Sequence, residues 1–379
     1  MGVFSTDQNP VALFGVDARK QVGIELKKLN VSRAMVFADA FMVDNGKAEE
    51  LAGYIREAGI EALIYKAEVG EPTSSFCDNA ADFARENKVD GMVGLGGGAT
   101  MDTAKIACKL VANGGKTDDY LGYANTAGNH PIMPLLLLTT TSGTGSEVSV
   151  RAAVESDAGV KGAINQGGTM AIVDPTYTYT VPPVITANTG IDALTHAVEC
   201  LFNCENVEHL MADMYAKESI KLIFQNLLIA YVDGSNEAAR VNLSYASMLA
   251  GFCLHLRKLT YGHSAGNQIS SKLHCPHGVS VGATLPSVIR YGVKNIPAFT
   301  THLCECLGVR NDAAAPDILI KMFDELQKNV KMKNMKELGI EREFIEGMVE
   351  EIKKDSKWKV MTPPDFDKMK ESLYEAWDY

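Results

Sequence analysis

The 379-residue sequence contains no run of about 18 apolar residues, the length that a helix needs to cross a membrane. Its beginning also lacks a basic segment followed by an apolar stretch, the pattern of a secretory signal. A basic excess is missing too, because 47 acidic residues outweigh 36 basic ones and give a net charge of −11. We therefore expect a cytoplasmic protein without a membrane or nucleic-acid partner, since both surfaces attract basic proteins.

Cysteine is sparse and shows no paired spacing: the eight residues are scattered along the chain. This pattern predicts reduced, buried thiols rather than a disulfide framework. Apolar residues make up 46% of the sequence and charged residues 22%, which is ordinary for a globular protein with a sizeable core. The length allows about two or three domains.

The first half of the chain alternates short apolar runs with helical patterns. This alternation predicts a parallel sheet, and the unbroken apolar run at 135–138 indicates a strand that is covered on both faces. The predicted strands are residues 34–38, 62–65, 91–95, 134–138 and 171–173, and the predicted helices between them include 46–58 and 79–87.

The second half is predominantly helical. Its character changes near residues 181–183, and the clearest helices are 206–231, 238–258, 313–328 and 365–377. We therefore predict two domains: an α/β nucleotide-binding domain with a parallel sheet over residues 1–184, and an all-α metal-binding domain over residues 185–379.

Four side chains of the second half have the chemistry of metal ligands. Asp192 and His196 are four residues apart, which on a helix places them within about 40° of each other and roughly 6 Å apart along the axis. His263 and His277 stand beside Gly and Pro, which mark the ends of helices or strands. Each alone would be read as a solvated pair or a core histidine. Together, three imidazoles and a carboxylate favour a site for Fe(II) or Zn(II).

A glycine-rich turn follows the predicted strand 91–95. Gly96, Gly97 and Gly98 precede a helical stretch that contains Asp102, so backbone N–H groups and the helix N-terminus can meet a pyrophosphate. The alternative is a simple tight turn. The loose dinucleotide-binding pattern G-x-G-x-x-A also fits here, but its ribose-binding acid would fall on Asp118 or Asp119, in a loop.

Asp39 is a better candidate for the ribose. It directly follows a predicted strand, where a carboxylate can accept from a ribose 2′-OH and repel a 2′-phosphate, although a helix cap is an equally good interpretation. A hydroxyl-rich loop follows strand 134–138. Since ligands of open α/β sheets bind at the carboxyl ends of strands, we expect its side chains to meet cofactor or substrate: Thr139, Thr140, Ser142 and Thr144.

On these motifs, from about residue 39 to residue 277, the chain resembles the group III, iron-containing alcohol dehydrogenases. The motifs are the stretches at 96–105, 141–147, 192–199 and 276–278. The resemblance implies a cleft between the two domains, NAD(H) as cofactor, and Fe(II) as the first choice of metal, with Zn(II) or Mn(II) able to take the same ligands. It also implies a small alcohol or aldehyde as substrate and a homodimer or higher homo-oligomer. In the family, residues matching Asp192, His196, His263 and His277 hold the metal, residues matching Asp39, Gly97, Gly98, Thr139 and Ser142 contact the cofactor, and Lys161 matches a lysine that lines the cleft.

Two positions depart from the family pattern. Asn267 stands where relatives commonly carry a histidine near the nicotinamide. A positioned acid–base group contributes about 10² to 10⁴ in rate, which is roughly 3 to 5 kcal/mol. A metal supplies roughly 10 kcal/mol toward deprotonation of bound water. The larger contribution is kept, so we expect activity. Arg257, followed by Lys258, stands where relatives acting on simple alcohols have small or apolar residues. If Arg257 faces the cleft, it could bind a carboxylate, sulfonate or phosphonate of the substrate; otherwise the pair is a solvated helix end.

The sequence thus predicts an NAD(H)- and metal-dependent oxidoreductase acting on a short alcohol or aldehyde, either neutral or anionic, with Asn267, Lys161 and Arg257 near the reaction. Two alternatives remain. Dehydroquinate synthase-like lyases also bind NAD and a metal, but with a different glycine motif. A filament-forming or structural protein could retain both sites without catalysis.

Overall fold

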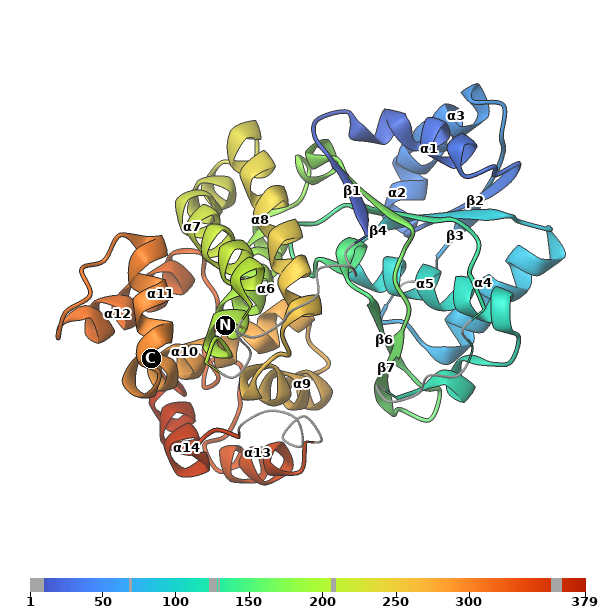
Figure 1. Cartoon of the computed structure of the whole chain (residues 1–379). Coiled ribbons are helices and arrows are strands. Elements are labelled where there is room, and N and C mark those ends of the chain that lie inside the picture. Colours follow the sequence, from blue (N-terminus) through green and yellow to red (C-terminus); the bar gives the residue numbers. More distant parts are fainter. Residues whose placement is uncertain (1–9, 68–69, 123–127, 129, 206–208, 356–362) are drawn as a thin grey trace. The chain divides into compact units, whose positions relative to one another are not determined.

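The computed structural model describes residues 10–67, 70–122, 128, 130–205, 209–355 and 363–379. The chain divides into two compact units, Gln8–Thr178 and Tyr179–Tyr379. The first is an α/β unit and the second is helical (Figure 1).

A six-stranded parallel sheet forms the centre of the α/β unit (Figure 1). Its strand order is β1-β8-β5-β4-β2-β3, and every neighbouring pair is parallel. The predicted parallel sheet is therefore confirmed. The strands are β1 (Val11–Phe14), β2 (Arg33–Ala38), β3 (Glu61–Lys66), β4 (Gly91–Gly96), β5 (Leu135–Thr139) and β8 (Met170–Val173).

Helices cover both faces of this sheet. Helices α1 (Val22–Lys28) and α3 (Lys47–Glu57) share one buried cluster with Leu136 and Leu138, whereas α4 (Ser74–Glu86) and α5 (Gly98–Asn113) share another with Leu135 and Leu137. Successive side chains of a strand point to opposite faces, so an unbroken apolar run is what a doubly covered strand requires.

Several elements of the α/β unit differ from the sequence-based expectations. Strand β1 was not predicted, nor was the antiparallel ribbon of β6 (Arg151–Glu155) and β7 (Lys161–Asn165). Helix α4 begins earlier than the predicted residue 79, because the Thr73 side chain accepts a hydrogen bond from Phe76 N and caps the helix there. The remaining short elements are α2 (Ala40–Asp44), η1 (Ala18–Gln21), η2 (Thr117–Tyr120), η3 (Ser146–Val148) and η4 (Pro175–Thr178).

The helical unit packs around one continuous apolar core. Helix α8 ends before the predicted residue 258, since Arg257 is already extended, with φ −139° and ψ 147°. Of the predicted helix 206–231, residues 206–208 lie outside the described residues. No helix in the described part of the chain is long and apolar enough to span a membrane. The helices are α6 (Pro183–Phe202), α7 (Leu210–Val232), α8 (Glu237–Leu256), α9 (Tyr261–Leu273), α10 (His277–Asn295), α11 (Pro297–Leu307), α12 (Ala315–Asn329), α13 (Phe344–Lys353) and α14 (Phe366–Glu375).

Candidate active site

Helix α6 carries two carboxylates and an imidazole that are buried inside the helical unit. Asp192, His196 and Glu199 are spaced i, i+4 and i+7, so they lie along one face of the helix. Asp192 Oδ1 lies 3.6 Å from His196 Nε2. Buried polar groups at this spacing need partners from elsewhere in the fold.

The starts of α9 and α10 supply those partners. His263 lies in the first turn of α9, whose N-terminus is capped by the Thr260 hydroxyl, and His277 is the first residue of α10. The structure brings the four predicted ligands together: one ligand atom each from Asp192, His196, His263 and His277 lie within 4.8 Å of one another. The rings of His196 and His263 are stacked, with centroids 4.8 Å apart.

Glycine next to each of these two histidines allows the helices to approach so closely. A Cβ on Gly278 would lie 2.1 Å from Asn188 O of α6, and a Cβ on Gly262 would lie 2.6 Å from Glu199 Oε1. Any larger residue would push His277 or His263 away from α6. The glycines that mark these motifs in the sequence therefore have a packing role.

Glu199 is a functional residue that the sequence-based analysis did not single out. Its Oε1 lies 2.7 Å from His263 Nδ1, while its Oε2 accepts from the backbone N–H and the hydroxyl of Thr260. This contact makes Nδ1 the donor and leaves His263 Nε2 as the nitrogen that faces the other ligands. Its i+7 spacing from Asp192 was the signal that could have revealed it.

The electrostatics of the group fit a bound cation. Among the described residues, Asp192 Oδ1 and His263 Nε2 are buried without a hydrogen-bond partner. Burial raises the pKa of Asp192, and lost hydration lowers the pKa of His277 to about 4, which keeps this imidazole neutral. Burial also opposes ionisation of Glu199, but His263 and Thr260 hold its pKa below the usual value. A divalent metal would satisfy both orphaned atoms, and nitrogen-rich ligands suit iron or zinc.

The predicted cofactor residues gather at the carboxyl ends of three adjacent strands of the α/β unit. Asp39 follows β2, Gly96 ends β4, and Thr139 ends β5. Backbone hydrogen bonds join these ends: Asp39 N donates to Leu95 O, and Thr140 N donates to Gly96 O. This edge is where open parallel sheets bind nucleotides.

The phosphate loop, Gly96 to Gly98, leads directly into α5. A Cβ on Gly98 would lie 2.7 Å from Thr144 Cγ2, whereas a Cβ on Gly97 would meet nothing closer than 3.9 Å. Gly98 is thus required by packing against the hydroxyl loop, residues 139–147. Gly97, the N-cap of α5, has no side chain to screen the helix N-terminus from an anion.

Asp39 caps a helix, one of the two interpretations that the sequence left open, and its contact with a ribose stays a prediction. Its Oδ1 accepts from Met42 N at 2.8 Å and caps α2. Its Oδ2 lies beside Gly96, 2.9 Å from the place of a Cβ there. Burial raises the pKa of this carboxyl, against the backbone hydrogen bonds that it accepts. The second oxygen is the one that a ribose hydroxyl could reach.

Asp102 has a structural role, because both of its oxygens are bonded within the protein. Oδ1 accepts from Lys105 Nζ at 3.2 Å and from Ser146 Oγ, and Oδ2 accepts from Ala153 N at 2.9 Å. The cofactor contact that we predicted for this carboxylate stays a prediction.

Arg257 requires a correction. Its side chain is fully buried, with Nη1 2.6 Å from Asp213 Oδ1 and 3.2 Å from Cys200 O, and with Nη2 3.4 Å from His209 O. The guanidinium is neither a solvated helix end nor an anion-binding group that faces a cleft, because α8 ends just before it and the extended backbone turns it inward. Lys258 beside it is exposed.

The roles of the other predicted site residues stay predictions. Lys161 is exposed at the start of β7, with Nζ 3.9 Å from Glu155 Oε2 on the paired strand. Asn267 is exposed on α9, one turn after His263. Thr140 is buried beside the phosphate loop, and Ser142 lies in the hydroxyl loop.

Comparison with known proteins agrees with this geometry. Residues 9–175 match the model of the iron-containing alcohol dehydrogenases, and residues 186–373 match that of the C-terminal part of the same family. The chain is 31% identical over 346 residues to the NAD-dependent methanol dehydrogenase of Bacillus methanolicus, with 89% of this chain and 90% of that protein covered.

Two solved structures are similar over nearly the whole chain. A 1,3-propanediol oxidoreductase superposes with a TM-score of 0.91 at 27% identity, covering 99% of this chain and 100% of its own. The sulfoacetaldehyde reductase of Bifidobacterium kashiwanohense, in complex with NAD+, superposes with a TM-score of 0.88 at 26% identity, covering 100% and 99%. The chain therefore belongs to the iron-containing alcohol dehydrogenase family and is an NAD-dependent oxidoreductase that acts on CH–OH groups.

Proposed function

We propose that this enzyme interconverts short primary alcohols and their aldehydes. The observation that carries this proposal is the metal centre, in which three ligands are buried while the side chain of His277 remains 37% exposed. A small oxygen ligand could reach the ion beside this partly exposed imidazole. The similarity to a methanol dehydrogenase and to a 1,3-propanediol oxidoreductase supports a small substrate.

The chain's own residues hold and orient the reacting groups. Asp192, His196, His263 and His277 would hold the metal ion, which when bound supplies Lewis-acid polarisation of the substrate oxygen. Glu199 keeps the His263 nitrogen directed at this site. In the α/β unit, the phosphate loop and Asp39 would bind the pyrophosphate and ribose of NAD(H), and the cofactor contributes the hydride.

The main test is an NADH-oxidation screen after the protein has been stripped of metal and reloaded with Fe(II) or Zn(II). We expect turnover of propanal and other short neutral aldehydes, which disappears when the metal is removed and returns when it is restored. Binding of NADH and metal without turnover of any aldehyde would support the structural-protein alternative. Turnover of a phosphorylated sugar acid without net NADH oxidation would support the lyase alternative.

Anionic aldehydes are the second substrate class to include, because one similar structure is a sulfoacetaldehyde reductase. Arg257 is not the group that would recognise them, since it is bonded to Asp213. We expect Arg257→Ala to lower the free energy of unfolding by about 3 kcal/mol, because it leaves Asp213 without its cation. The ratio of kcat/KM for sulfoacetaldehyde to that for propanal should not change. A fall in kcat/KM for sulfoacetaldehyde alone would show that Arg257 does bind the anionic group of the substrate.

Asp39 should set the preference between the two nicotinamide cofactors. Asn in its place can still cap α2 but carries no charge to repel a 2′-phosphate. We expect Asp39→Asn to raise kcat/KM with NADPH relative to NADH by about tenfold, the effect of roughly 1.4 kcal/mol. Steady-state kinetics with both cofactors measure this ratio. An unchanged ratio would reduce Asp39 to a helix cap.

A further inference from the structure

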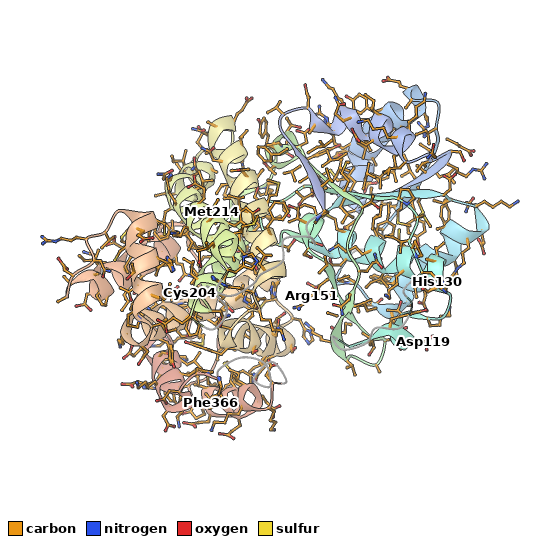
Figure 2. All side chains as sticks on the ribbon, in the orientation of Figure 1. Asp119, His130, Arg151, Cys204, Met214 and Phe366 are labelled. Atoms are coloured by element: carbon orange, nitrogen blue, oxygen red, sulfur yellow. The ribbon has the colours of Figure 1, made fainter. Side chains whose placement is uncertain are left out.

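A buried lysine lies directly behind the loops that we assign to the cofactor. Lys105 of α5 has no exposed surface, and its Nζ contacts four oxygens. These are Ser146 Oγ at 2.7 Å, Arg151 O at 2.9 Å, Ser149 Oγ at 3.2 Å and Asp102 Oδ1 at 3.2 Å. Arg151 is labelled in Figure 2, at the start of β6. We call this set the Lys105 clamp.

The clamp joins three segments of the α/β unit. Ser146 Oγ donates to Asp102 Oδ1 and accepts from Lys105 Nζ, so the hydroxyl loop is bonded to both of these residues of α5. Asp102 Oδ2 accepts from Ala153 N, which adds β6 to the same network. Apart from the Lys105–Asp102 ion pair within α5, these contacts join α5 to residues more than forty positions later in the chain.

The clamp reaches the phosphate loop through two short links. Ser146 N donates to Thr144 Oγ1, and the Thr144 side chain packs where a Cβ on Gly98 would lie. Lys105 itself is seven residues after Gly98, about 10 Å along α5. The clamp thus connects the helix whose N-terminus would face the pyrophosphate with the loop that packs against that N-terminus.

The charges inside the clamp are closely balanced. Burial lowers the pKa of Lys105, while Asp102 opposes this change. Glu147 is a second nearby carboxyl, buried and without a hydrogen-bond partner among the described residues, and burial raises its pKa to about 7. Asp102 is therefore the hydrogen-bonded counter-ion of Lys105.

Lys109, one turn further along α5, makes a useful comparison. It is also buried, but its Nζ donates to Gly128 O at 2.9 Å and Asn165 O at 3.4 Å rather than to the hydroxyl loop.

We propose that Lys105 and Asp102 are positioning residues that hold the phosphate loop and the hydroxyl loop at the spacing that NAD(H) requires. This inference rests on the proposed assignment of those loops to the cofactor.

The test compares Lys105→Met with Lys109→Met, which removes another buried ammonium from the same helix. NADH binding is measured by fluorescence without any substrate, so its result does not depend on which alcohol the enzyme uses. We expect Lys105→Met to raise the NADH dissociation constant and the KM for NADH at least tenfold, and kcat at saturating NADH to change less than threefold. Lys109→Met should change NADH binding less than twofold.

Ser146→Ala provides a milder variant in case Lys105→Met does not fold, since it keeps the ion pair and removes only the hydroxyl link. We expect a roughly threefold weaker NADH affinity, with the metal content and the melting temperature close to those of the unaltered protein. Equal losses of NADH affinity in the Lys105 and Lys109 variants would overturn the proposal, as would unchanged affinity in Lys105→Met and Ser146→Ala.

Discussion

Replacing His263 by alanine will abolish stable metal binding and lower kcat/KM for short aldehydes by about 10³-fold. The variant loses one of four ligands, and it also leaves Glu199 buried without the imidazole that it now contacts at 2.7 Å. A metal that polarises a carbonyl contributes several kcal/mol, and about 4 kcal/mol corresponds to three orders of magnitude in rate. Metal content by mass spectrometry and steady-state kinetics measure the two losses.

His274→Asn is the matched control for this variant. His274 is exposed, ends α9 in a left-handed conformation with φ 49°, and is separated from His277 by only two residues. Asn adopts that conformation readily, so the control should keep its fold, its metal and its activity. If His263→Ala retained both metal and turnover, the four residues could not be the catalytic metal centre.

Replacing Glu199 by glutamine will weaken metal binding by about 10- to 100-fold, the range found for groups that orient metal ligands. The amide oxygen can still accept from Thr260, but the amide nitrogen would then face His263 Nδ1 as a donor. Nδ1 would become the acceptor and Nε2 would carry the proton. The nitrogen directed at the metal would no longer have a free lone pair.

Thr260→Ser separates this effect from a general disturbance of α9. Serine keeps the hydroxyl that donates to Glu199 and caps the helix, so metal affinity should stay within about twofold. Titration of the stripped proteins with Zn(II) in the presence of a chelating indicator gives the affinities. Equal affinities of Glu199→Gln and the unaltered protein would show that Glu199 only anchors the start of α9.

Local patterns were enough to predict the general fold. The apolar runs that became β2, β3, β4, β5 and β8 were all recognised, because a strand covered on both faces must be apolar throughout. The ribbon of β6 and β7 was missed. Burial alternates along β6, and both strands begin and end with polar residues, so neither stands out from a loop in the sequence.

The sequence also showed where the glycine-rich motifs are, but not why glycine is needed there. Gly98, Gly262 and Gly278 were visible as markers in the sequence, but the reason for each one lies in a distant residue: Thr144, Glu199 and Asn188, respectively. A sequence shows that a side chain is absent. Only the packed structure shows which atom occupies the space.

The amino-acid sequence by itself determined the helix spacing of Asp192 and His196, the strand–glycine–helix order of the phosphate loop, and the chemistry of the four metal ligands. These properties depend on neighbours along the chain. Tertiary structure alone decided the partners of two buried side chains: Arg257 pairs with Asp213, and His263 with Glu199. A buried charge must find a partner to offset its lost hydration, and the partner's position in the sequence is set by how the helices and strands pack.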